Sequence, residues 1–129
     1  MKDIPGFGFS KNHVFIEENE FFKYRVLEAV SAGMNDGGVA LYFGIKENEN
    51  GYKVEGLKNP DALLASLHAL LSQDPRLSFH RVSSRDFLSL EEGGKKALCL
   101  FVQEVEGKDK PVSFAGLCYL FENGKIVPM

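Results

Sequence analysis

The sequence predicts a single α/β domain in which two helices pack on a mixed β-sheet. Apolar residues recur at helical spacing in two segments, and these alternate with apolar runs too short for a typical helix. The 129 residues match one domain, and a chain of this length can bury about two-thirds of its surface around one core. Hydrophobic residues at 44% and charged residues at 26% are typical of a folded protein. We therefore expect one compact domain over residues 1–129.

The N-terminal third is predicted to hold an extended segment and a helix. Residues 5–16 are aromatic and interrupted by glycine, which favours an irregular strand. Residues 18–34 have apolar side chains at helical spacing, and the acidic residues that begin this segment suit the positive end of a helix dipole. Asn35, Gly37 and Gly38 then predict a helix stop and a tight turn, because glycine adopts the positive φ that such a turn needs.

The glycine turn is interpreted as structural rather than phosphate-binding. Phosphate-binding glycine loops run from a strand into a helix, whereas Gly37 and Gly38 run from a helix into a strand. The strand that follows, over residues 39–45, is apolar on both alternating faces, which predicts a central strand covered on both sides. A polar run over 46–51 predicts a hairpin loop into a partner strand over 52–56.

The second helix has the clearest signal in the chain. Asn59 fits the N-cap and Pro60 the first helical position, a leucine stripe follows, and Asp74 with Pro75 ends the pattern. Further strands are predicted over 77–82, 96–105, 113–120 and 125–127.

Composition and spacing exclude several classes of function. Fifteen Lys and Arg against eighteen Asp and Glu give a formal charge of −3, so any site for a polyanion must be local. Cys99 and Cys118 each lie in an apolar run, which indicates packed thiols and no disulfide framework. The three histidines show no metal-ligand spacing, so no metal or other cofactor is expected. No leader and no membrane span are recognisable, which predicts an intracellular, cytoplasmic location.

Basic side chains gather in one part of the sequence. Arg76, Arg81 and Arg85 fall within ten residues, and Lys95 and Lys96 follow in the next predicted element. Within a strand, Arg81 and Arg85 would share one face. Guanidinium groups suit phosphate, so these five residues are the candidate nucleic-acid-binding residues. The alternative interpretation is a solvated strand edge that its charges protect.

Acidic residues gather around Glu17 and Glu20 and again around Glu47. Converging carboxylates hold divalent metals in nucleases, which makes these three residues weak catalytic candidates. The alternative is that the first group stabilises a helix start and the second lies in a solvated loop.

The order of elements and one stretch resemble the Schlafen and AlbA-2 domain family. The stretch is Ser31-Ala32-Gly33-Met34-Asn35-Asp36-Gly37-Gly38-Val39-Ala40-Leu41-Tyr42-Phe43-Gly44-Ile45, followed by Lys53-Val54-Glu55-Gly56-Leu57 and a second helix. The resemblance implies a compact domain that binds nucleic acid, and in Schlafen nucleases it implies RNA cleavage by three acidic residues. Gly8 stands where one of these acids is expected, and Lys46 follows Gly44-Ile45 where another is expected.

The resemblance therefore implies an RNA recognition or processing domain, most simply a non-catalytic subunit of an endoribonuclease assembly such as one that processes piRNA precursors. Two alternatives stay open: an active nuclease that uses a divalent metal, and a protein-interaction module without RNA contact. Schlafen cores pair two lobes around a basic groove, so the resemblance also implies a second Schlafen-like lobe, identical or different, as partner. The candidate interface residues are Phe7, Phe9 and Phe15. Their segment carries more aromatic residues than a solvent-exposed tail would, which favours contact with a partner.

Overall fold

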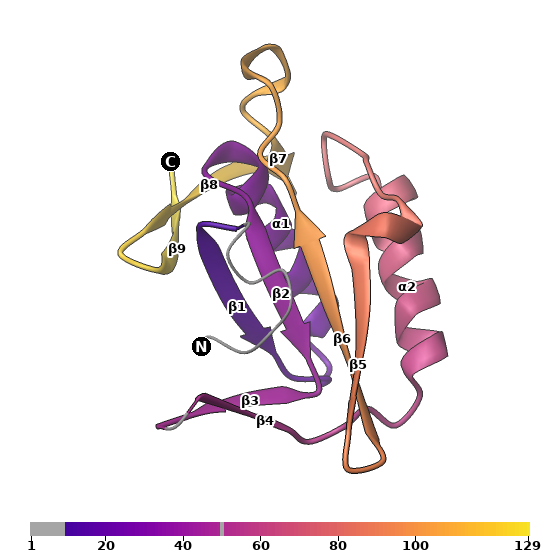
Figure 1. The fold of residues 1–129 in the computed structure, drawn as a ribbon. Helices are drawn as coiled ribbons and strands as arrows, with labels where there is room; N and C mark the ends of the chain where they lie inside the picture. The colour runs from indigo at the N-terminus through magenta and orange to yellow at the C-terminus, as the bar shows by residue number, and fades with distance from the viewer. Residues whose placement is uncertain (1–9, 50) are drawn as a thin grey trace.

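The computed structural model describes residues 10–49 and 51–129. A four-stranded sheet of order β1-β2-β6-β5 forms the centre, and both helices cover one of its faces (Figure 1). Strands β1 and β2 are parallel, and the other two pairings are antiparallel. The elements are β1 (Asn12–Ile16), α1 (Phe22–Asn35), β2 (Val39–Phe43), β3 (Ile45–Asn48), β4 (Gly51–Val54), α2 (Pro60–Gln73), β5 (Phe87–Glu92), β6 (Lys95–Val102), β7 (Ser113–Phe114), β8 (Leu117–Glu122) and β9 (Lys125–Pro128), with 3-10 turns at Ser84–Asp86 and Gly107–Asp109. The predicted α/β class with two helices on a mixed sheet is confirmed.

Strand β2 is the buried centre of the sheet, and all five of its residues are buried. Leu41 and Phe43 pack with the helices, whereas Ala40 and Tyr42 join a second apolar cluster on the opposite face. The alternation of a strand explains this division, because successive side chains point to opposite faces. The predicted central strand, covered on both sides, is thus present in the structure.

Helix α2 begins where the sequence predicts. The side chain of Asn59 accepts a hydrogen bond from the backbone N–H of Ala62 at 3.1 Å, and Pro60 is the first helical residue. This cap satisfies one of the backbone donors that a helix start leaves unpaired. Leu63 and Leu67 lie on the buried side of the helix.

Helix α1 begins at Phe22, four residues later than the predicted start, so the acidic residues precede the helix and none lies in its first turn. The reason is the parallel pairing of β1 with β2, which extends to the pair Ile16 and Phe43. The chain needs the following residues to reverse direction before a helix can begin.

The predicted strand over 77–82 is wrong. Leu77 is buried and makes only an isolated bridge with Phe114, and the strand at this edge of the sheet is β5, over 87–92. Leu88 and Leu90 of β5 pack in the second apolar cluster, so the later segment supplies the apolar side chains that pair with β6. Glu91 and Glu92 are the last residues of this strand.

A smaller sheet of β7, β8 and β9 packs on α1 (Figure 1). Strand β6 ends at Val102, three residues before the predicted end. Strands β3 and β4 form a hairpin below the main sheet (Figure 1), and residues 46–48, predicted to lie in its loop, belong to β3. No helix of the described residues is long and apolar enough to cross a membrane.

Candidate functional site

The structure divides the five predicted basic residues between the two ends of the β5–β6 hairpin. Arg85 precedes β5, at the end where Phe87 pairs with Leu100, whereas Lys95 lies at the turn end, where it pairs with Glu92. Five steps of a strand at about 3.3 Å separate these ends by roughly 17 Å. The predicted basic residues therefore do not form one patch.

Arg76 is engaged by an internal partner. Its Nε and Nη2 donate to the two carboxylate oxygens of Asp74 at 3.0 and 2.9 Å, and its guanidinium lies 5.5 Å from the ring centroid of Phe114. The hydrogen bond from Arg76 holds the pKa of the Asp74 carboxyl below its ordinary value. Because Asp74 already accepts two hydrogen bonds from the guanidinium, Arg76 is a poor candidate for binding phosphate.

Lys95 and Lys96 meet a third lysine that the sequence prediction missed. Lys58, just before α2, lines the same surface hollow as these two residues. The backbone N–H of Leu57 donates to the carbonyl of Lys96 at 2.8 Å, which ties the segment before α2 to β6. Gly56 has a φ of 91° and lies so close to Lys95 that an added Cβ would be 3.2 Å from the Lys95 Cβ. We call Lys58, Lys95 and Lys96 the lysine cluster.

No lysine of this cluster has a carboxylate within ion-pair distance in the described part of the chain. Glu91 and Glu92 are their cross-strand neighbours in β5 but form no ion pair with them. The sequence did contain a signal for Lys58. Anions bind readily at a helix N-terminus, and Lys58 lies directly before the predicted start of the second helix. The three lysines that line this hollow therefore form no ion pair within the described residues.

The acidic candidates do not come together as a metal site. Glu17 lines a second hollow with Glu18 and Glu55, next to the lysine cluster. Glu20 is exposed in the connection before α1, and Glu47 faces Tyr52 across the β3–β4 hairpin. Among residues 10–49 and 51–129, no group of three His, Cys, Asp or Glu side chains is arranged to hold a metal ion.

Of the aromatic candidates, Phe7 and Phe9 lie outside the described residues. Phe15 lies in β1, on the sheet face opposite the helices, and its ring stacks on Tyr42 with centroids 4.8 Å apart. His13, one pleat earlier on the same face, places Nδ1 2.8 Å from the Tyr42 hydroxyl. Burial lowers the pKa of His13 and raises the pKa of Tyr42, so both groups favour their neutral forms.

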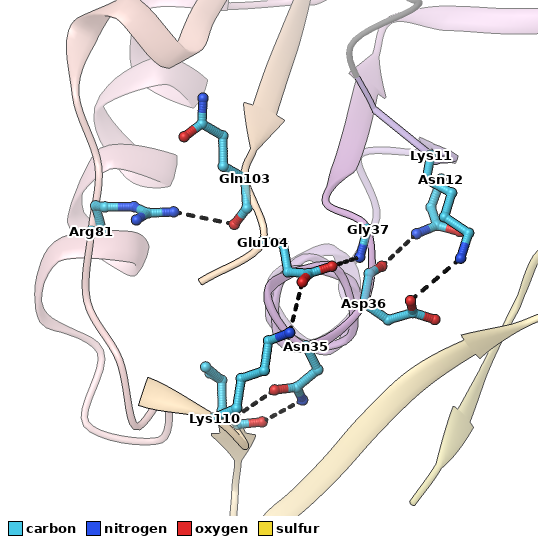
Figure 2. A network of polar contacts seen from close by, with 10 residues as sticks. Lys11, Asn12, Asn35, Asp36, Gly37, Arg81, Gln103, Glu104 and Lys110 are labelled. Atoms are coloured by element: carbon cyan, nitrogen blue, oxygen red, sulfur yellow. Dashed lines mark hydrogen bonds and ion pairs between the residues drawn. The ribbon is translucent and has the colours of Figure 1, made fainter. Parts of the chain in front are cut away.

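Asn35, Gly37 and Gly38 form the turn between α1 and β2, and both glycines have positive φ, 77° and 74°. A polar network surrounds this turn (Figure 2). The carboxylate of Glu104, just beyond β6, accepts hydrogen bonds from the backbone N–H of Gly37 and from Nζ of Lys110. The turn thus fastens the end of β6 to the end of α1.

The comparisons with known proteins concern the fold. Neither a family model nor a curated protein matches the chain. The N-terminal domain of a RecG-related protein of Nitrosomonas europaea, described as related to an ATP-dependent DNA helicase, is similar with a TM-score of 0.60 and 22% identity over 80% of this chain and 68% of that one. The DIP2311 protein of Corynebacterium diphtheriae is similar with a TM-score of 0.62 and 16% identity over 92% of this chain but only 25% of that protein. The chain shares the α/β fold of both.

Proposed function

We propose that this chain is a Schlafen-like domain that binds RNA through the lysine cluster and serves as a non-catalytic subunit of an RNA-processing assembly. The observation that supports it best is that Lys58, Lys95 and Lys96 line one surface hollow and have no ion-pair partners in the described residues. Lysine ammonium groups attract backbone phosphates regardless of base sequence. The fold shared with a domain of a helicase-related protein adds support for a nucleic-acid role.

The acidic hollow beside the lysine cluster limits where a phosphate can bind. Glu55 lines both hollows and lies between the lysines and the pair Glu17 and Glu18. Carboxylates repel phosphate unless a metal neutralises them. The sugar-phosphate chain should therefore bind at the lysine end, away from Glu17 and Glu18.

The proposal includes a second Schlafen-like lobe and an intracellular setting. One small lobe supplies a single wall of a groove, and Phe15 on the sheet face opposite the helices is the described candidate for contact with the other lobe. Cys99 and Cys118 are both free thiols, which fits a reducing compartment such as the cytoplasm.

The test compares the salt dependence of RNA binding in three proteins: wild type, a variant with Lys58, Lys95 and Lys96 changed to alanine, and a control with Lys23, Lys108 and Lys125 changed to alanine. The control removes the same charge from exposed sites elsewhere. Each lost phosphate contact lowers the slope of log K against log salt by about 0.7 for single strands, so the cluster variant should lose about 2. Equal slopes in the cluster and control variants would reject the lysine cluster as the RNA-binding site.

A cleavage assay with the same proteins tests the non-catalytic assignment. We expect structured RNA to stay intact in magnesium or manganese when the chain is alone. Cleavage that disappears in Glu17→Gln or Glu47→Gln would show that the chain is itself a nuclease.

A further inference from the structure

A second pocket lies at the other end of the β5–β6 hairpin from the lysine cluster. Its apolar wall comes from Leu71 of α2 and from Leu100 and Val102 of β6, and its polar rim includes Arg81 and Asp86. The pocket has a volume of about 160 Å³. That volume suits one small planar group, and the combination of apolar wall and few polar groups is typical of a ligand site.

The guanidinium of Arg81 is held in place but retains free donors. Its Nη2 donates to the backbone carbonyl of Gln103 at 3.2 Å, and its Cζ lies 5.6 Å from the ring centroid of Phe79. No carboxylate of the described residues lies within ion-pair distance of Arg81. Because a guanidinium has five N–H groups, several donors remain for a ligand at the rim.

The carbonyl that positions Arg81 belongs to a fixed part of the chain. Figure 2 shows Gln103 directly before Glu104, whose carboxylate binds Gly37 and Lys110. The contact between Lys110 Nζ and Glu104 is 2.7 Å long. The Arg81 side of the pocket is therefore anchored to the α1 end rather than to a free loop.

The acceptor side of the rim is Asp86. Its Oδ2 accepts a hydrogen bond from the backbone N–H of Ser83 at 2.8 Å, which fixes the carboxylate in a capping box. Oδ1 has no hydrogen-bond partner among the described residues, and Asp86 forms no ion pair with Arg81 although both line the pocket. A ligand between them must offer hydrogen-bond donors to the carboxylate and acceptors to the guanidinium.

We propose that this pocket binds a guanine base of single-stranded RNA, an inference that rests on the proposed function. Guanine presents N1–H and the N2 amino group as adjacent donors for Asp86, and O6 and N7 as acceptors for Arg81. Adenine lacks the O6 acceptor and the N1–H donor, and uracil lacks a pair of adjacent donors. The pocket that Leu71, Leu100 and Val102 line would receive a base that has left its stack, as in single-strand recognition.

The pocket and the lysine cluster can bind one RNA strand. They lie at opposite ends of the β5–β6 hairpin, roughly 17 Å apart. A stacked single strand rises about 3.4 Å along its axis per nucleotide, so about five nucleotides span the distance. The lysine cluster supplies affinity without base preference, and the pocket supplies the preference.

The test measures fluorescence anisotropy of ten-nucleotide RNAs: all uridine, all adenosine, and uridine with one internal guanosine. Wild type should bind the guanosine-containing RNA about 5- to 150-fold more tightly than the all-uridine RNA, since a good bidentate base contact discriminates by that much. Asp86→Asn and Arg81→Gln should each abolish this preference. Asp109→Asn, at the acid of the other 3-10 turn, is the matched control and should keep the preference.

The outcomes separate this inference from the proposed function. Equal affinity for all three RNAs, or a preference that survives both pocket variants, would overturn the guanine assignment and leave the lysine cluster untouched. A second experiment titrates the protein with free guanosine monophosphate or adenosine monophosphate. The backbone amide chemical shifts of Arg81, Ser83 and Asp86 then report binding in the pocket without an RNA strand on the lysine cluster. Shifts with guanosine monophosphate alone are expected, and indistinguishable responses would also overturn the assignment. Equal salt slopes in the lysine-cluster variant and its control, together with an intact guanine preference, would overturn only the lysine cluster.

Discussion

The side-chain amide of Asn35 binds the backbone of Val112 in both directions, across 77 residues of sequence. Nδ2 donates to the Val112 carbonyl at 2.9 Å, and Oδ1 accepts from the Val112 N–H at 2.7 Å. Nδ2 also donates to the carbonyl of Tyr119 at 3.0 Å. The last residue of α1 therefore holds both β8 and the segment before β7 against the helix, in a buried position where water cannot replace the bonds.

We predict that Asn35→Ala lowers the free energy of unfolding by about 2–4 kcal/mol. The change leaves the Val112 N–H and the Tyr119 carbonyl buried without partners, and each such group costs about 1–3 kcal/mol. Urea unfolding measures the loss, with Asn59→Ala as the control because that residue only caps α2 and should cost about 1 kcal/mol. If Asn35→Ala lowered the free energy of unfolding less than Asn59→Ala does, the stabilising role of the Asn35 hydrogen bonds would be contradicted.

We predict that Gly38→Ala is more destabilising than Gly93→Ala, although both positions have positive φ, 74° and 60°. An added Cβ at Gly38 would lie 2.8 Å from the carbonyl oxygen of Val102, whereas nothing lies within 4 Å at Gly93. Backbone strain alone costs about 1–2 kcal/mol, and the contact with Val102 adds to it only at Gly38. Thermal unfolding of the two variants gives the comparison, and equal melting temperatures would show that the β6 end moves aside freely.

We predict that part of the stability contributed by Glu104 is lost in acid. The hydrogen bond from Lys110, and then that from Gly37, lower the pKa of Glu104 below its ordinary value of 4.5. A carboxyl whose pKa is lowered by folding stabilises the protein above its unfolded pKa, and this contribution disappears as the pH falls through the folded pKa. The difference in melting temperature between wild type and Glu104→Gln should therefore be constant from pH 7 to about 5 and shrink below 4.5.

Glu106→Gln is the control for this pH series, because Glu106 forms only an exposed ion pair with Lys108 at 3.6 Å. Exposed pairs contribute little, so this variant should follow wild type at every pH. A Glu104→Gln difference that stays constant down to pH 3 would mean that its carboxylate does not stabilise the turn.

The sequence by itself determines the elements whose causes are local. Asn59 and Pro60 begin α2 because a capping side chain and a preset φ act within one helical turn. Gly37 and Gly38 form the turn after α1 because few other residues adopt positive φ cheaply. The apolar run of β2 predicts its burial on both faces, since a strand covered on both sides has near-continuous apolar side chains.

Only the tertiary structure decides which charges meet. Arg81 was predicted to share a strand face with Arg85, but its segment forms no strand, and Arg81 binds the carbonyl of Gln103 instead. Lys58 joins Lys95 and Lys96 only because the segment before α2 pairs with β6 through Leu57. The physical reason is that strand register and loop path follow from how the whole apolar core packs, and charged side chains, which contribute little to that packing, are placed by it.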